Sequence, residues 1–246
     1  MLSSKTVIVT GASRGIGHSI AELFAHKEYN VLINYNHSKE SAMHLYDKLK
    51  SEGLFVKTYK ADVSNRYEVD LMTKFCIEEF GGLDILINNA GICQEKLFTD
   101  ITDEDLDHML NTNFKSAFYC SQSALKHMLP NKQGKIINIS SIWGIVGASC
   151  EVHYSATKAA IIGFTKALAK ELGPSNIQVN CIAPGVIQTE MLSSYNENEL
   201  GELKEHTPLM RLGNPNDIAG CALYLASLYS NFVTGQVISP NGGFVI

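Results

Sequence analysis

The sequence predicts a doubly wound α/β fold, a single domain over residues 1–246 with about seven parallel strands and helices on both faces of the sheet. Three observations support this prediction. Short apolar runs of the kind buried in parallel sheets alternate with longer amphipathic segments. A glycine-rich turn joins the first apolar run to the first amphipathic segment. The chain has 246 residues without a linker-like run or an internal repeat, which suits one large domain.

The elements follow one another in chain order. Strands are expected at residues 6–9, 31–33, 55–59, 85–87, 135–139, 178–183 and 236–239. Helices are expected around residues 20–25, 39–52 and 67–80, from a capping box at Thr102 to Met128, over 159–172 and over 215–228. Residues 186 to about 210 are polar and weakly patterned, so we expect a substrate lid there, with a short helix at best.

The glycine-rich turn runs Thr10-Gly-Ala-Ser-Arg-Gly-Ile-Gly17. Its glycines remove side chains where the backbone turns tightly and approaches a diphosphate, and the helix that follows offers free N–H groups to that anion. The alternative is a tight connection with no ligand. In this strand–turn–helix context the turn favours a Rossmann nucleotide site. The residues of the turn expected to contact the cofactor are Gly11, Ser13, Arg14, Gly15, Ile16 and Gly17.

The end of the second strand predicts which nicotinamide cofactor binds. Many NAD-binding chains carry an acid there, which bonds the ribose 2′-hydroxyl. This chain has Asn34 and Tyr35 instead, with His37 and Lys39 following and Arg14 in the glycine turn. A neutral position beside a cation favours NADP(H) over NAD. The alternative for Arg14 is a solvated turn residue.

Two further strand ends carry candidate cofactor contacts. Asp62, followed by Val63, could cap the next helix or bond the adenine amine, and both interpretations stay open. The fourth strand ends in an Asn-Asn-Ala-Gly sequence, which includes Asn89, Ala90 and Gly91. Small and amide residues there suit the crevice of a doubly wound sheet, beside the glycine turn.

Tyr154 and Lys158 are four residues apart where the helix over 159–172 opens, so their side chains share one face. A free tyrosine has a pKa of about 10. A unit charge about 4 Å away supplies roughly 4 kcal/mol at an effective dielectric near 20, enough to bring that pKa to about 7. Lys158 alone would then make Tyr154 an acid and base near neutrality. The alternative is a helix that carries the two residues by chance.

Composition excludes several classes of protein. The net charge of −5 argues against a nucleic-acid partner. No apolar run reaches the roughly 18 residues of a membrane span, and the amino terminus resembles no signal peptide. The six cysteines lack Cys-x-x-Cys spacing, which fits a cytoplasmic protein without disulfides or a metal site.

With these motifs in order, the sequence resembles the short-chain dehydrogenase/reductase superfamily over essentially its whole length. The motifs that carry the resemblance are the glycine turn, Asn88-Asn-Ala-Gly91, Asn113, Ser141, Tyr154-x-x-x-Lys158 and Pro184-Gly185 with Thr189. Within the superfamily, the chain is most similar to bacterial 3-oxoacyl-(acyl carrier protein) reductases, in its glycine turn, in residues 206–213 and in the Asn-Gly-Gly near its end.

The resemblance implies a role for each matching residue. Tyr154 would be the acid and base, and Lys158 would assist it and bond the nicotinamide ribose. Ser141 would position and polarise the substrate carbonyl, and Asn113 would hold a water that relays protons. Pro184, Gly185, Ile187 and Thr189 would complete the cofactor site, with the Ile187 backbone and Thr189 on the carboxamide.

The resemblance also implies an activity, NADPH-dependent reduction of a 3-oxoacyl thioester on acyl carrier protein or CoA, in a homotetramer. Two departures concern the substrate. Lys132 is the one basic side chain expected near the pocket mouth, because Ser175 stands where a second is expected. Trp143 is a bulky aromatic residue that we expect to narrow the pocket. One alternative is a reductase of another ketone, such as a steroid, a sugar or a diketone. A second is a nucleotide-binding regulator without catalysis, against which the intact Asn113, Ser141, Tyr154 and Lys158 weigh.

Overall fold

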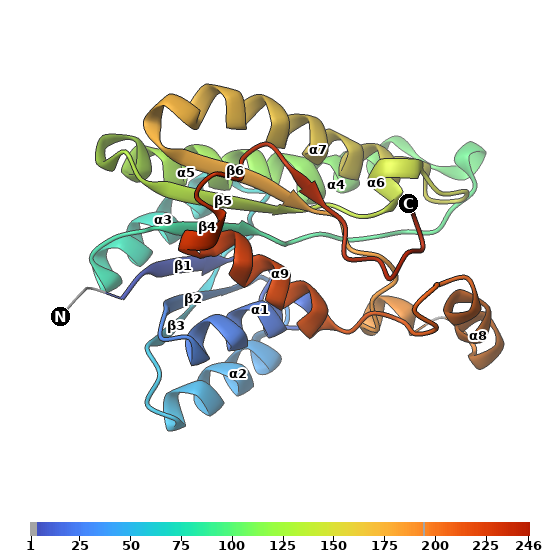
Figure 1. Ribbon diagram of the computed structural model, residues 1–246, viewed down its shortest axis with the longest axis horizontal. Coiled ribbons are helices and arrows are strands. Elements are labelled where there is room, and N and C mark those ends of the chain that lie inside the picture. Colours follow the sequence, from blue (N-terminus) through green and yellow to red (C-terminus); the bar gives the residue numbers. More distant parts are fainter. Residues whose placement is uncertain (1–3, 194) are drawn as a thin grey trace.

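The centre of the molecule is a parallel β-sheet. The computed structural model describes residues 4–193 and 195–246 and contains, within these ranges, the strands β1 (Thr6–Val9), β2 (Asn30–Tyr35), β3 (Val56–Lys60), β4 (Ile85–Asn88), β5 (Gly134–Ile139), β6 (Ile177–Ile182) and β7 (Val237–Ile238). They form one seven-stranded sheet in the order β3-β2-β1-β4-β5-β6-β7, and each neighbouring pair is parallel (Figure 1). The predicted α/β fold class is confirmed.

The strand order reverses between β1 and β4. The chain winds outward from β1 to β3, then returns to the centre and winds the other way from β4 to β7. In such sheets the crevice at the reversal, outside the carboxyl ends of the strands, is where ligands bind. The glycine turn follows β1 and the Asn-Asn-Ala-Gly sequence follows β4, so both predicted motifs lie at this point.

Helices cover both faces of the sheet (Figure 1). The helices on one face are α1 (Gly15–His26), α2 (Lys39–Ser51) and α9 (Pro215–Ala226), and those on the other are α3 (Arg66–Phe80), α5 (Ser116–Asn131) and α7 (Val152–Leu172). Successive strand residues point to opposite faces. Val7 and Val9 therefore pack in the core under α1 and α9, whereas Ile8 packs in the core under α3 and α5. Both faces of the inner strands β1, β2, β4, β5 and β6 are largely buried, which explains why these strands are mainly apolar in sequence.

The helix predicted from Thr102 to Met128 has a π-helical turn in its middle. It begins as α4 (Asp103–Leu110), with the predicted capping box formed between Thr102 and Asp105. Residues Asn111–Lys115 then form one π-helical turn before α5 continues the helix. A π-turn inserts an extra residue into the helical repeat and is frequent at functional sites. The apolar pattern of the sequence did not predict it.

The structure contains one helix that the sequence analysis did not predict and one that is longer than predicted. The four-residue α6 (Trp143–Val146) follows β5 directly. The predicted lid contains the nine-residue α8 (Glu197–Glu205), with a capping box at Asn196. Figure 1 shows α8 off the carboxyl edge of the sheet, away from the layers of the core. Among the residues that the structure describes, no helix is both long and apolar enough to cross a bilayer.

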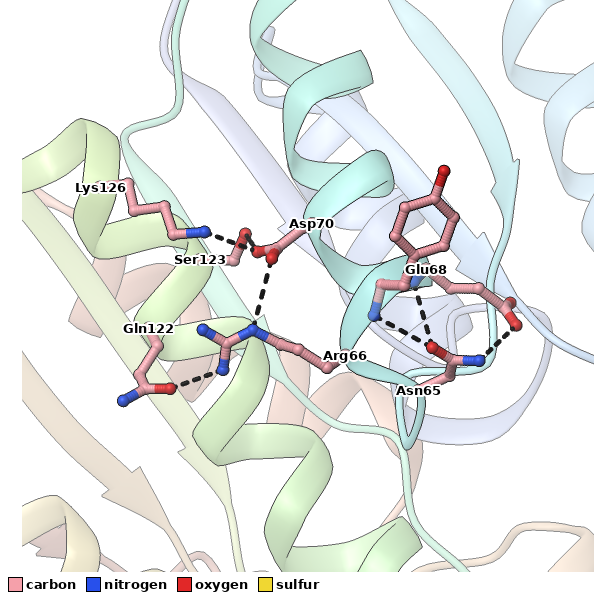
Figure 2. Close-up of polar contacts among 8 residues, drawn as sticks. Asn65, Arg66, Glu68, Asp70, Gln122, Ser123 and Lys126 are labelled. Carbon is pink, nitrogen blue, oxygen red and sulfur yellow. Dashed lines mark hydrogen bonds and ion pairs between the residues drawn. The ribbon is translucent and has the colours of Figure 1, made fainter.

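A polar network on the outer surface fastens α3 to α5 (Figure 2). The Asp70 carboxylate accepts hydrogen bonds from Ser123 Oγ at 2.7 Å, Lys126 Nζ at 3.0 Å and Arg66 Nε at 3.4 Å. Arg66 also donates to Gln122 Oε1 at 2.6 Å. Burial acts against the charge of Asp70, but the bonds from Ser123 and Lys126 and the charges of Lys126 and Arg66 outweigh it and lower the pKa of this carboxyl.

We expect Asp70→Asn to lower the free energy of unfolding by about 1 kcal/mol or less at pH 7, because the network is partly solvated. A carboxyl with a lowered pKa contributes stability above its ordinary pKa of 3.8 and loses it as the pH falls through the lowered value. The free energies of unfolding of the wild type and of Asp70→Asn, measured with urea, should therefore become equal below about pH 4. The control is Glu78→Gln on the same helix, whose pair with Lys74 is largely exposed at 3.7 Å and should contribute nothing measurable. A constant difference between pH 7 and pH 3 would contradict the prediction.

Candidate active site

The glycine turn and the segment after β4 are in close contact. A Cβ at Gly11, where φ is +61°, would lie 2.9 Å from the Cα of Ala90. A Cβ at Gly17 would lie 2.4 Å from Asn89 Nδ2. Thr10 Oγ1 accepts hydrogen bonds from the N–H groups of Asn89 at 2.9 Å and Ala90 at 3.0 Å. Only glycine fits at Gly11 and Gly17, so these two residues set the distance between the loops that flank the crevice.

The amino terminus of α1 has the features of an anion site. The helix α1 begins at Gly15 with no capping hydrogen bond from the Arg14 side chain and no acid in its first turn. By contrast, Asn65 caps α3 and Asn214 caps α9. The open end faces a cavity of about 500 Å³, whose lining includes Ser13, Arg14, Gly15, His18, Ser41, Thr189 and Glu190. Free N–H groups, a cation and room beside them fit the diphosphate of a nucleotide.

Two predicted cofactor residues on β2 have structural roles for their side chains. Asn34 is buried, its Oδ1 accepts from the Gly11 N–H at 3.1 Å, and its Nδ2 donates to the Ala61 oxygen at 3.1 Å. It therefore ties the glycine turn to the end of β3. The Tyr35 side chain packs in the core beneath α1 and α2. These two residues could contact a cofactor through their backbone N–H and C=O groups. The strand β2 does not end in a carboxylate.

One of the two alternatives for Asp62 is wrong. Asp62 Oδ1 accepts from the N–H of Ser64 at 2.9 Å and from its Oγ at 2.7 Å, which forms a local turn. The helix α3 is capped three residues further on by Asn65. The contact of Asp62 with the adenine amine stays a prediction. Val63 is buried in the core under α3, so its side chain is structural.

Ser141, Tyr154 and Lys158 meet beyond the carboxyl end of β5. Ser141 Oγ accepts from the Trp143 N–H at 3.1 Å, where α6 starts, and forms a hydrogen bond with the Tyr154 side chain. Ser140 Oγ donates to the backbone oxygen of Lys158 at 2.7 Å. The two serines therefore have different roles. Ser140 bonds to the backbone of α7, and Ser141 faces the Tyr154 phenol. The sequence prediction had chosen Ser141.

Lys158 is buried beside the tyrosine. Its Nζ donates to the backbone oxygen of Ile139 at 3.0 Å and lies 5.6 Å from the centre of the Tyr154 ring. Burial lowers the pKa of Lys158 to about 8, and the nearby Cys181 and Cys93 offset only part of that effect. The ammonium is therefore mostly charged at pH 7.

The predicted effect of Lys158 on Tyr154 is wrong for the protein alone. Burial raises the pKa of Tyr154 well above its ordinary value, and the hydrogen bond with Ser141 only partly opposes this. Cys93 and Glu151 raise the pKa further. The charge of Lys158 would lower this pKa, but desolvation of the phenol is the larger effect here.

The π-helical turn brings Asn113 to the same place. Asn113 Oδ1 accepts from the Ile92 N–H at 2.8 Å, and Nδ2 donates to the Ile92 oxygen at 2.9 Å and to Thr157 Oγ1 at 3.1 Å. A Cβ at Gly91 would lie 3.2 Å from Asn113 Oδ1 and 3.3 Å from Lys158 Nζ. Gly91 therefore leaves the space in which the amide and the ammonium come together. The water held by Asn113 stays a prediction.

The segment after β6 runs back to the glycine turn. Pro184 accepts from the Ile142 N–H at 3.0 Å, and a Cβ at Gly185 would lie 2.6 Å from the Cα of Asn241. Ile187 forms a parallel bridge with Gly213. The methyl group of Thr189 lies 3.5 Å from the position of a Cβ at Gly15. The predicted carboxamide residues and the predicted diphosphate residues therefore border one crevice. Ile16, the last of the residues predicted to contact the cofactor, lies in the first turn of α1 and packs against the core.

A match to a known protein family agrees with this arrangement of residues. The sequence model of the family described as short chain dehydrogenase matches residues 5–200. The chain belongs to the short-chain dehydrogenase family. Its members are oxidoreductases that use a nicotinamide cofactor. Two similar proteins are the 3-oxoacyl-[acyl-carrier-protein] reductases FabG of Staphylococcus aureus, 41% identical over 243 residues and 99% of each chain, and of Chlamydia muridarum, 42% identical over 246 residues, 99% of this chain and 98% of the relative.

Acidic residues at the mouth of this dehydrogenase site were missed by the sequence analysis. Burial, with a contribution from Glu95, raises the pKa of Glu151 to about 7. Glu95 in turn accepts a hydrogen bond from Tyr195 Oη of the lid segment at 2.6 Å. The available signal was the spacing of Glu151, one helical turn before Tyr154. Within residues 4–193 and 195–246, no group of three or more His, Cys, Asp or Glu side chains could hold a metal ion.

A buried ladder of amides beneath the site was also missed. Asn88 Nδ2 donates to Asn138 Oδ1 at 2.8 Å, and Asn138 Nδ2 donates to Thr165 Oγ1 at 2.9 Å. Asn138 and Thr165 are fully buried. The ladder ties β4, β5 and α7 together. Its signal in the sequence was a single asparagine inside the apolar run of β5.

Lys132, the basic residue predicted for the pocket mouth, lies elsewhere in the chain, as does Ser175. Lys132 follows α5 and Ser175 follows α7, and the oxygen of Lys132 accepts a hydrogen bond from Asn176 at 3.3 Å. This is the amino edge of the sheet, because both helices run back to the start of the next strand. Tyr154 stands near the opposite end of α7, roughly 30 Å away at 1.5 Å per residue. Within this chain the prediction for Lys132 is wrong. Trp143 packs edge-on against Phe244, with ring centres 5.9 Å apart.

We expect Gly91→Ala to lower kcat by about ten- to hundredfold, because its methyl group would displace Asn113 or Lys158 by a few tenths of an ångström or more. The melting temperature should change little. The matched control is Gly163→Ala on α7, where an added Cβ meets nothing within 4 Å. That exchange should stabilise the helix by about 0.5–1 kcal/mol and leave kcat unchanged. Equal kcat values for the two variants would contradict the importance of the space that Gly91 leaves beside Asn113 and Lys158.

Proposed function

We propose that the chain reduces a ketone to a secondary alcohol with NADPH, and that its substrate is a 3-oxoacyl thioester carried by acyl carrier protein or CoA. The observation that carries the proposal is the buried contact of Ser141, Tyr154 and Lys158 beside the glycine-turn crevice. The substrate is inferred from the names of the relatives, which are about 41% identical over nearly the whole chain.

The chemistry requires a hydride at carbon and a proton at oxygen. The nicotinamide, when bound, supplies the hydride to the carbonyl carbon. Ser141 donates a hydrogen bond to the carbonyl oxygen, and Tyr154 Oη gives its proton to the oxygen as negative charge develops there. The raised pKa of Tyr154 suits this direction, since the phenol remains protonated until an alkoxide is present to take the proton. The Lys158 ammonium then stabilises the phenolate, and Asn113 holds the water through which the proton is replaced.

The choice of NADPH rests on charge at the end of β2. No carboxylate ends this strand, and the Arg14 side chain lines the cavity in front of α1. A guanidinium suits a phosphate because it offers a planar pair of donors. An NAD-selective site would instead place an acid against the ribose 2′-hydroxyl.

A second candidate function, reduction of another ketone, is favoured by the carboxylates at the site mouth. Glu95 and Glu151 place two acids where an anionic carrier would approach. Like charges at an interface disfavour a partner, and acyl carrier protein and CoA are both anionic. A neutral ketone would meet no such penalty. The first candidate keeps preference because the similarity to the named reductases extends over the whole chain.

The enzyme assembles as a homotetramer in this proposal, in the cytoplasm. Phe114 in the π-helical turn, Phe118 in α5 and Phe164 in α7 form an aromatic cluster with ring centres 5.8–6.4 Å apart. Phe118 is 38% exposed. A partly exposed aromatic cluster on two long helices favours an interface between subunits. The six cysteines are free thiols, which suits a reducing compartment.

Tyr154→Phe should reduce kcat by about 10²–10⁴-fold, because only the proton donor is removed. NADPH should bind the variant as it binds the wild type, which fluorescence titration measures. Tyr229→Phe serves as the control, because Tyr229 is 90% exposed and far from the site in sequence. Retention of more than about a tenth of wild-type kcat would exclude Tyr154 as the acid.

The lid should distinguish the two candidate substrates. Met191 in the lid segment is 52% exposed, and we expect it to contact an acyl chain together with Leu192 and Tyr195. Met191→Asp should raise KM for a long-chain 3-oxoacyl thioester, because the carboxylate would be desolvated against the chain. KM for a small diketone should change much less. Equal changes in KM for both substrates would contradict a contact between the lid and the acyl chain. Activity on diketones alone would favour the second candidate.

A further inference from the structure

The side chain of Arg14 joins the glycine turn to the start of the lid segment. Arg14 Nη1 donates to Glu190 Oε2 at 2.9 Å, and the two side chains are 62% and 69% exposed. Glu190 begins the short helix η4 (Glu190–Leu192), which Thr189 caps by accepting from the Met191 N–H at 3.4 Å. The first turn of the lid is therefore fastened to the residue that the proposed function assigns to cofactor choice.

The residues of this ion pair lie in the wall of the cavity before α1. Arg14 and Glu190 both line this cavity of about 500 Å³, together with Ser13, His18 and Ser41. A phosphate that enters it meets a guanidinium already bonded to a carboxylate. It also meets the negative charge of that carboxylate. The lining thus contains one group that attracts a phosphate and one that opposes it.

We propose that Glu190 is a specificity-determining residue, whose carboxylate competes with the 2′-phosphate of the cofactor for Arg14. The inference rests on the proposed preference for NADPH. A guanidinium binds a phosphate best through two parallel N–H groups, and Glu190 occupies Nη1 of Arg14, one of the groups that such a contact uses. An exposed carboxylate pair is weak, so a dianionic phosphate displaces it. The displacement reduces the affinity gained from the phosphate, and a cofactor with a 2′-hydroxyl leaves the pair intact.

This competition couples cofactor identity to the lid. When the phosphate takes Arg14, η4 loses its ion pair with the glycine turn, and Thr189, which caps η4, stays beside Gly15. A cofactor without the phosphate does not break that bond. By linkage, whatever frees the lid from Arg14 also favours the phosphorylated cofactor by the same factor.

Titration calorimetry with two nucleotide fragments tests the competition apart from turnover. The probes are adenosine 2′,5′-bisphosphate and 5′-AMP, which differ only in the 2′-phosphate. Glu190→Gln should tighten binding of the bisphosphate by about two- to fivefold, the worth of an exposed ion pair, and leave 5′-AMP unchanged. Glu205→Gln, an equal change of charge at an exposed position of the same segment, should alter neither affinity.

A double-variant cycle locates the effect at Arg14. In an Arg14→Ala background, Glu190→Gln should no longer tighten bisphosphate binding. Hydrogen exchange of residues 190–192 should be faster with the bisphosphate than with 5′-AMP in the wild type, and equal in Glu190→Gln.

The outcomes separate this inference from the proposed function. A wild type that prefers the bisphosphate but gains nothing from Glu190→Gln overturns the competition and leaves the NADPH preference in place. Equal tightening of both fragments also overturns it, since a general field effect would then act. A wild type that binds the two fragments equally overturns both.

Discussion

The docking of α7 on the end of β5 is the interaction on which the candidate site depends. Asn138 and Ser140 point to the same face of the sheet, and both bond to α7, at Thr165 and at the oxygen of Lys158. The oxygen of Ile139, between them, accepts from Lys158 Nζ. Because Lys158 and Thr165 are two helical turns apart, these bonds fix both the rotation and the axial position of the helix. Tyr154, one turn earlier, is thereby held against Ser141.

The same docking determines the electrostatics of the site. It removes a phenol and an ammonium from water together, which raises the pKa of Tyr154 and lowers that of Lys158. The two effects move the pKa values of the two groups apart, because that of the phenol rises and that of the ammonium falls. A phenol that keeps its proton and an ammonium mostly charged at pH 7 form a donor with a cation behind it. This arrangement serves proton delivery to an alkoxide better than proton removal from an alcohol.

Local patterns were sufficient for the strands and for the motifs at their ends. The π-turn was not predictable, because one extra residue at Asn113 hardly alters an apolar pattern. Nor was the bond between Asn138 and Thr165, which depends on how α7 crosses the sheet. Two other errors were avoidable. Alternation from Val31 and Ile33 already places Tyr35 in the core. Helices of a parallel sheet return to its amino edge, which puts Lys132 there.

Two bonds that a ligand could replace hold the early part of the lid segment, one at Glu190 and one at Tyr195. Glu190 bonds Arg14 on the cofactor side, and Tyr195 bonds Glu95 on the substrate side. Both contacts are exposed, so each contributes little free energy, and the position of the segment is close to balance. Met191 and Leu192 lie between them in sequence. A phosphate acting on Arg14 and an acyl chain acting beside Tyr195 would therefore shift one short stretch of chain, which gives cofactor and substrate a direct physical route to affect each other's binding.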